Sequence, residues 1–128
     1  MPTVTDVVQV RAGIPVLVCD PDGPLIATMD DALDLIGATW AYQGVEAVAV
    51  PAARLDERFF SPGTRFAGEV MQKFVNYRLT LAVVGDISSY LTASSALRAL
   101  VRESNRSGHV WFVPDLDALD GRLAVRAS

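Results

Sequence analysis

The chain has 128 residues, a hydrophobic fraction of 51% and a formal net charge of −4, which predicts one domain with a substantial core. This acidic balance argues against binding along a nucleic-acid backbone. The single cysteine, Cys19, excludes an internal disulfide framework and a cysteine-rich metal site, and favours a reduced, cytoplasmic setting. No apolar run approaches the about 18 residues of a membrane span, and residues 1–20 lack a signal-peptide pattern.

The first part of the chain predicts a hairpin followed by a capped helix. Residues Thr3–Val10 and Ile14–Cys19 are rich in β-formers and flank a short turn, so they are expected to pair as antiparallel strands. Residues Asp20–Pro24 are dense in turn formers and predict a surface loop. Thr28 and Asp31 resemble a capping box at a helix start.

The helix that follows is expected to pack one face inward and to end near Gly44. A strand over Val45–Val50 comes next, stopped by Pro51, and Ala52–Phe60 then suggests a short helical turn over one end of the sheet. The predicted inner face of the helix contains Leu33, Ile36, Gly37 and Trp40.

The stretch Gly63–Ser89 predicts a helix, a buried strand and a polar turn. Residues Leu79–Val84 form a nearly continuous apolar run, as in a strand covered on both faces, and this strand delivers Asp86 to the surface. The helix places Phe66, Val70, Phe74 and Tyr77 on an inward stripe and Arg65, Glu69, Gln72, Lys73 and Asn76 on the opposite side. Glu69 and Lys73 have the spacing of a helix ion pair.

The last part predicts a helix, a strand and a short final helix. The first helix starts at Thr92 or Ser94 and ends at Arg106. The strand covers His109–Val113, and the final helix runs from Pro114 to about Leu123 before a fraying tail. In the longer helix, Leu97, Leu100, Val101 and Ser104 face inward and Arg98, Arg102, Asn105 and Arg106 face outward.

Strands that alternate with helices predict a single α/β domain over residues 1–128. We expect a mixed, mostly parallel sheet of about five strands, with the first strand antiparallel at one edge. About four helices pack against this sheet in a STAS-like sandwich.

The segments GEVMQKFVNYRLTLAVVGDIS and SSALRALVRESNRSG resemble the bacterial family catalogued as domain of unknown function 4180. The likeness covers most of the chain, and the family has no assigned reaction. The element order is also similar to that of STAS domains, whose regulators carry a phosphorylatable serine in an Asp-Ser-Ser/Thr-Gly loop. The comparable segment here, Phe60–Thr64, lacks the acidic residue and the paired hydroxyls.

Isolated chemical groups each have two interpretations. Asp20, Asp86 and Asp115 follow strands and could hold Mg²⁺, or they could be ordinary turn and cap residues. Lys73, the only lysine, could be a catalytic amine if it were buried, or it forms an ordinary surface pair with Glu69. His109, the only histidine, would need a nucleophile and an orienting acid for a triad, and is otherwise a polar residue at a strand start. Hydroxyls between Asp86 and Ser95 could cradle an anion, or they could cap helices.

The sequence therefore predicts no catalytic set, metal site or cofactor, and leaves open whether the protein is an enzyme. Our leading hypothesis is a non-enzymatic regulatory or protein-interaction module. The alternative is a small-ligand binder for anions or nucleotides, or a Mg²⁺-dependent enzyme, that uses the Asp86–Ser95 loop. A homodimer through the first strand is a further prediction, since open edges invite pairing. The candidate site residues are Glu69, Gln72, Lys73, Asn76, Asp86, Ser88, Ser95, Arg98, Arg102 and Asn105.

Overall fold

Five strands form one mixed sheet in the computed structural model, which describes residues 6–127. The order in the sheet is β1-β2-β3-β4-β5; β1 is antiparallel to β2, and the other neighbours are parallel. The strands are β1 (Val7–Arg11), β2 (Ile14–Val18), β3 (Ala47–Pro51), β4 (Thr80–Val84) and β5 (Val110–Val113). The predicted α/β class, the five strands and the antiparallel edge strand are confirmed. Residues 3–5 of the predicted first strand lie outside the described residues.

A two-residue turn joins β1 to β2. Arg11 pairs with Ile14, and the intervening Ala12 and Gly13 have φ angles of 50° and 81°. Two consecutive left-handed residues give the turn the twist that an antiparallel hairpin requires, which is why glycine suits this position.

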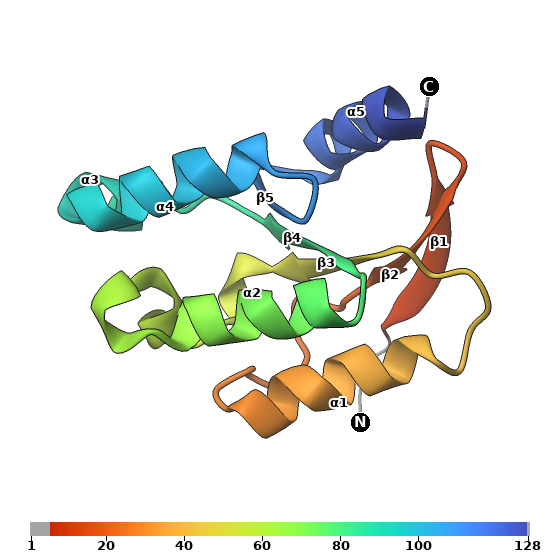
Figure 1. Cartoon of the computed structure of the whole chain (residues 1–128), viewed down its shortest axis with the longest axis horizontal. Coiled ribbons are helices and arrows are strands. Elements are labelled where there is room, and N and C mark those ends of the chain that lie inside the picture. The colour runs from red at the N-terminus through yellow and green to blue at the C-terminus, as the bar shows by residue number, and fades with distance from the viewer. Residues whose placement is uncertain (1–5, 128) are drawn as a thin grey trace.

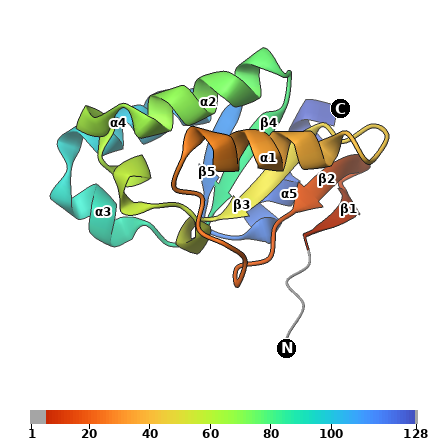
Figure 2. The same ribbon diagram turned by 90° about the horizontal axis from the view of Figure 1, so that it is seen from below.

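Helices cover the two faces of the sheet unequally. The helices are α1 (Met29–Thr39), α2 (Phe66–Asn76), α3 (Ser88–Ala93), α4 (Ser95–Arg106) and α5 (Leu116–Ala127). Each of α1, α2 and α4 connects two successive parallel strands. Because these crossovers are right-handed and the sheet order runs in one direction, all three helices lie on the same face (Figure 1). Figure 2 shows α1 and α2 in front of the sheet and α5 behind it.

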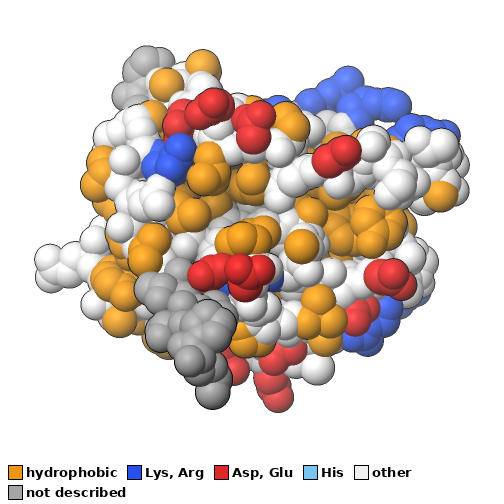
Figure 3. Space-filling view, turned by 180° about the vertical axis from the view of Figure 1, so that it is seen from behind, with side chains coloured by type: hydrophobic (Ala, Val, Ile, Leu, Met, Phe, Trp, Pro, Cys, Tyr) orange, Lys and Arg blue, Asp and Glu red, His pale blue; other side chains and the backbone are white. Residues whose placement is uncertain are grey.

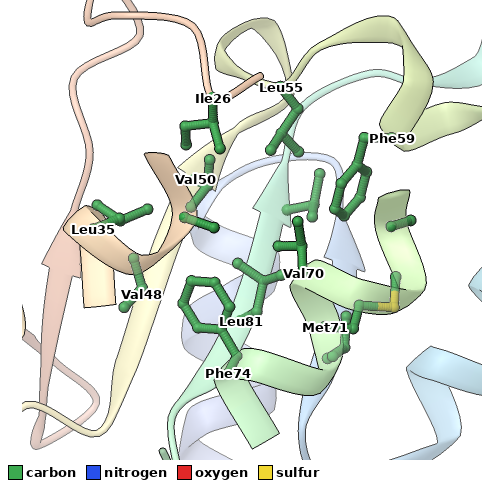
Figure 4. Packing of buried hydrophobic residues seen from close by; sticks show 14 of the residues in the cluster. Ile26, Leu35, Val48, Val50, Leu55, Phe59, Val70, Met71, Phe74 and Leu81 are labelled. Atoms are coloured by element: carbon green, nitrogen blue, oxygen red, sulfur yellow. The ribbon is translucent and has the colours of Figure 1, made fainter. Parts of the chain in front are cut away.

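The larger core lies between the sheet and these three helices. Phe74 of α2 and Leu81 of β4 are each 1% exposed and pack beside Val48 of β3 (Figure 4). All of β4 except Val84 is buried, so the prediction of an inner strand covered on both faces is confirmed. On the other face, Leu119 and Leu123 of α5 pack over small strand residues, among them Ala47 and Ala82.

Local signals explain the start of α1. The Thr28 side chain accepts a hydrogen bond from the Asp31 N–H at 3.1 Å, and the Asp31 carboxylate accepts from the N–H groups of Ala27 and Thr28. These bonds, with that from Ala27 foremost, lower the pKa of Asp31. The predicted capping box is therefore confirmed.

Several predicted boundaries and faces are wrong. Trp40 and Tyr77, assigned to inner stripes, are 69% and 45% exposed. The helical period does not continue to them, because α1 ends at Thr39 and α2 at Asn76. Ser88, assigned to a turn, begins the short helix α3, and α5 continues past Leu123 to Ala127. Among the described residues, no helix has the length and apolarity to cross a bilayer.

Candidate functional site

The polar row of α2 faces outward as predicted. Glu69, Gln72 and Asn76 are exposed, and Lys73 is half-buried. The Gln72 side-chain amide donates a hydrogen bond to the Asn76 side-chain oxygen at 2.9 Å. The ion pairs found in residues 6–127 do not include Glu69 with Lys73, so the predicted pair is not formed.

The Asp86 turn is exposed but largely engaged with itself. The Asp86 carboxylate accepts a hydrogen bond from the Ser88 N–H at 2.9 Å. Hydrogen bonds from the Ser88 side chain and backbone lower the pKa of Asp86. Asp86, Ser88 and Asn105 line one pocket of about 290 Å³ between the ends of β4 and β5 and the helices α3 and α4. The α2 residues do not line this pocket.

The start of α4 shows how other polar groups of the Asp86–Ser95 loop accept hydrogen bonds. The Ser94 hydroxyl accepts a hydrogen bond from the Leu97 N–H at 3.1 Å, which caps α4. Arg98 donates to the Leu91 carbonyl at 2.5 Å, which closes the end of α3. Ser95 itself is exposed. These contacts favour the capping interpretation of the loop hydroxyls over an anion cradle.

Three candidates for metal binding do not come together. Within residues 6–127, no group of three His, Cys, Asp or Glu side chains has the arrangement of a metal site. Asp86 and Asp115 are instead engaged with backbone groups: Asp115 accepts from the Ala118 N–H at 2.8 Å. The described residues therefore offer no magnesium site at the strand ends.

Asn105, predicted as part of the outer row of α4, is a structural residue. It is half-buried, and its side-chain oxygen accepts a hydrogen bond from the Phe112 N–H at 2.7 Å. Arg102 on the same helix is exposed. Figure 3 shows basic side chains gathered where α4 lies and acidic side chains spread over much of the remaining face. The predicted set is therefore divided between the α2 row, the Asp86 pocket and the α4 surface.

An exposed aromatic cluster lies where α1 and α2 end, and the sequence prediction missed it. The ring centroids of Trp40 and Tyr77 are 5.6 Å apart with an angle of 58° between the planes, a tilted aromatic contact. Tyr42, in the loop after α1, is 47% exposed. Because Tyr77 directly follows Asn76, this cluster extends the polar row of α2. The sequence analysis placed both rings on inner stripes because it extended each helix past its last residue. Hydrophobic periodicity alone does not locate the end of a helix.

Arg78, next to Tyr77, has a left-handed backbone with φ of 58°. The Arg78 N–H donates to the Val75 carbonyl at 3.0 Å, and the Leu79 N–H donates to the Phe74 carbonyl at 2.9 Å. This pair of bonds is a Schellman motif, in which glycine usually takes the left-handed position. The exposed Arg78 side chain also lines a pocket of about 320 Å³ together with His109 and Arg126.

Neither a curated protein nor a solved structure gives a significant match to the chain, so the likeness to STAS domains stays a prediction about topology. A family model with the description "Domain of unknown function (DUF4180)" matches residues 11–123. Because this match covers nearly the whole chain, the protein belongs to the domain of unknown function 4180 family, the family that its sequence motifs indicated.

Proposed function

We propose that the protein is a non-enzymatic, cytoplasmic regulatory module that binds a partner protein through the exposed aromatic pair of Trp40 and Tyr77, with the exposed Tyr42 two residues after Trp40 in the chain. The observation that carries this proposal is the exposed contact between Trp40 and Tyr77 at the ends of two neighbouring helices. Trp and Tyr dominate the energetic centres of protein interfaces, because they bury a large rigid area at a small entropic cost. The polar row of α2 would then form the rim of the contact.

The charge beside the cluster favours a partner segment that combines acidic and apolar side chains. Arg78, which follows Tyr77 in the chain, lines a pocket together with Val75, Leu79, Thr80, Gly108, His109 and Arg126. These described lining residues include two arginines and no carboxylate. An apolar partner side chain would contact Trp40 and Tyr77, while partner carboxylates would accept from the two guanidinium groups.

The backbone of Arg78 supports a functional use of its side chain. A residue other than glycine in the left-handed region costs about 1–2 kcal/mol. Such strain persists where the side chain is needed, and it is concentrated at binding sites. Arg65 and Ala12 also have left-handed backbones, so what distinguishes Arg78 is that it follows the exposed Tyr77 and lines the pocket with Arg126.

The test compares two peptide libraries on immobilised protein. One library combines Asp and Glu with Leu and Phe; the other replaces each acidic residue by Lys. We expect the acidic library to contain binders of the wild type, and the double variant Trp40→Ala/Tyr77→Ala to bind them at least about tenfold more weakly, a loss of about 1.4 kcal/mol. Leu25→Ala is the matched control, because Leu25 is 51% exposed and lies outside the cluster.

The proposed surface is wrong if the double variant retains the binders or if Leu25→Ala loses them equally. Equal binding of the basic library, or no binder in the acidic library, would contradict the proposed chemistry of the partner. Thermal melting of each variant verifies folding, since truncation of exposed side chains changes stability little.

A further inference from the structure

A second pocket of about 500 Å³ lies between the α4–β5 connection and α5 and shares Gly108 and Arg126 with the pocket that Arg78 lines. It is lined by Asn105, Arg106, Ser107, Gly108, Trp111, Ala118, Gly121, Arg122, Val125 and Arg126. Three of the 11 Lys and Arg residues of the chain therefore line one pocket, although the net charge is −4. None of the described lining residues is acidic, so the pocket has the opposite charge to the molecule as a whole.

Trp111 of β5 holds two of these arginines in place. Trp111 is 4% exposed, and its indole N–H donates to the Ser107 carbonyl at 2.8 Å. The guanidinium carbons of Arg122 and Arg126 lie 5.5 Å and 5.7 Å from the centre of the ring. Such cation–π contacts fix flexible side chains before any ligand arrives, which lowers the entropic cost of binding.

Hydrogen bonds to backbone carbonyls and to one hydroxyl also hold the same two side chains. Nη1 of Arg122 donates to the Asn105 carbonyl at 2.9 Å, and Nη1 of Arg126 donates to the Gly108 carbonyl at 3.4 Å and to the Thr80 hydroxyl. Among the described residues, the one carboxylate within 4.0 Å of these two guanidinium groups belongs to Glu46, at 3.8 Å from Nη2 of Arg126.

Several guanidinium N–H groups in this pocket form no hydrogen bond with a described residue. Nε and Nη2 of Arg122 donate to no described residue, and Arg106, which is exposed, forms no hydrogen bond or ion pair with one. Arg122 is thus anchored through one nitrogen while its other donors remain available. Anchored arginines with available donors are what recognition of a multi-oxygen anion needs.

We propose that this pocket binds a phosphate-bearing small molecule. A phosphate group presents several charged oxygens, enough to accept from Arg106 and Arg122 at once, with Arg126 adding positive charge. The pocket volume exceeds that of a phosphate alone, and its walls at Ala118 and Val125 are apolar. The phosphate binds at the arginines and an organic part of the ligand contacts these apolar walls. This site is distinct from the Asp86–Ser95 loop.

Trp111 makes the site measurable in the full chain. The chain has two tryptophans, and Trp40→Phe leaves Trp111, which contacts the arginines, as the sole indole. Trp40 does not line the pocket. In this background, glycerol 3-phosphate and inorganic phosphate are titrated while indole fluorescence is recorded at constant ionic strength. We expect a saturable change, with glycerol 3-phosphate binding at least as tightly as inorganic phosphate.

Variants then assign the binding to the pocket. Arg106→Gln and Arg122→Gln should each weaken the binding of glycerol 3-phosphate about tenfold or more. Arg106→Gln removes no hydrogen bond or ion pair with a described residue, so it tests the site with little effect on the fold. Arg102→Gln, an exposed arginine of the same helix α4 outside the pocket, is the charge-matched control and should leave the affinity unchanged.

Three outcomes would overturn the proposal: no saturable change with either phosphate, an equal loss in Arg102→Gln, or an equal response to acetate at the same ionic strength. The first removes the site, the second shows only general charge attraction, and the third shows that phosphate is not the preferred anion.

Discussion

The side-chain oxygen of Asn105 in α4 accepts a hydrogen bond from the Phe112 N–H of β5 at 2.7 Å. Because β5 is at one edge of the sheet, outward backbone donors of this strand have no neighbouring strand to bond. The Ser107 hydroxyl accepts similarly from the Val110 N–H at 3.3 Å. Side chains thus satisfy donors on this edge, which blocks pairing with another chain there.

Asn105→Ala should therefore destabilise the protein by about 1–3 kcal/mol, because it leaves the partly buried Phe112 N–H without its acceptor. Arg102→Ala on the same helix should change the free energy of unfolding by less than about 0.5 kcal/mol. Urea denaturation at neutral pH measures both values. Equal effects of the two substitutions would show that Asn105 is an ordinary surface residue.

Arg78→Gly should separate stability from binding. Glycine adopts the left-handed backbone without strain, so the variant should be more stable by about 1 kcal/mol. The variant should also bind the acidic peptides more weakly, because it lacks the guanidinium group of the residue that follows Tyr77. The matched control is Arg65→Gly: Arg65 has φ of 64° at the other end of α2. It should gain stability similarly and keep peptide binding; loss of binding in both variants would remove the specific role of Arg78.

Local and nonlocal features differed in how well the sequence predicted them. The capping box at Thr28 was correct because its partners are three residues apart, and β4 was correct because burial on both faces leaves a continuous apolar run. Trp40 and Tyr77 were assigned to the core because a periodic stripe does not show where its helix ends. The bond from Phe112 to Asn105 and the arginine pocket join separate elements, so no local pattern encodes them.

Cys19 should be unreactive in the folded protein. Burial is the main cause that raises the pKa of its thiol to about 12, and the side chain is 2% exposed. At pH 8 the thiolate fraction is then about 10⁻⁴, against roughly a quarter for an exposed thiol with a pKa near 8.5. Alkylation by iodoacetamide at pH 8, followed by mass spectrometry, should be slow without denaturant and fast above the unfolding midpoint in urea. Rapid alkylation of the folded chain would contradict the burial of Cys19, which directly follows β2.

The same shift sets a pH dependence for stability. The folded pKa of Cys19 lies above its unfolded value, so the stabilisation is fully present below about pH 8.5 and is lost as pH rises toward 12. Cys19→Ala should show a smaller loss of stability over this window than the wild type. If the free energy of unfolding falls equally steeply with pH in the two proteins, Cys19 does not contribute to this pH dependence.

The opposite edge of the sheet should mediate a homodimer, because the described part of β1 lacks the protection found at β5. Val10 pairs with Pro15, which has no N–H, so this pair is of the non-hydrogen-bonded type. Hydrogen-bonded and non-hydrogen-bonded pairs alternate along antiparallel strands. The N–H and C=O groups of Val8 and Val10 therefore point away from β2, toward the open edge of the sheet. The one charged residue of β1, Arg11, is engaged with Asp120 of α5 at 2.6 Å.

Two copies of β1 can pair antiparallel about a two-fold axis, which gives each copy the same contact. Sedimentation velocity or light scattering should therefore detect a dimer of the wild type. Val10→Lys should give a monomer, because Val10 is 71% exposed on this strand and lysine guards an open edge. Val125→Lys, which alters a 76% exposed valine on α5, should remain dimeric. A monomeric wild type, or a Val10→Lys variant that still dimerises, would exclude this edge as the interface.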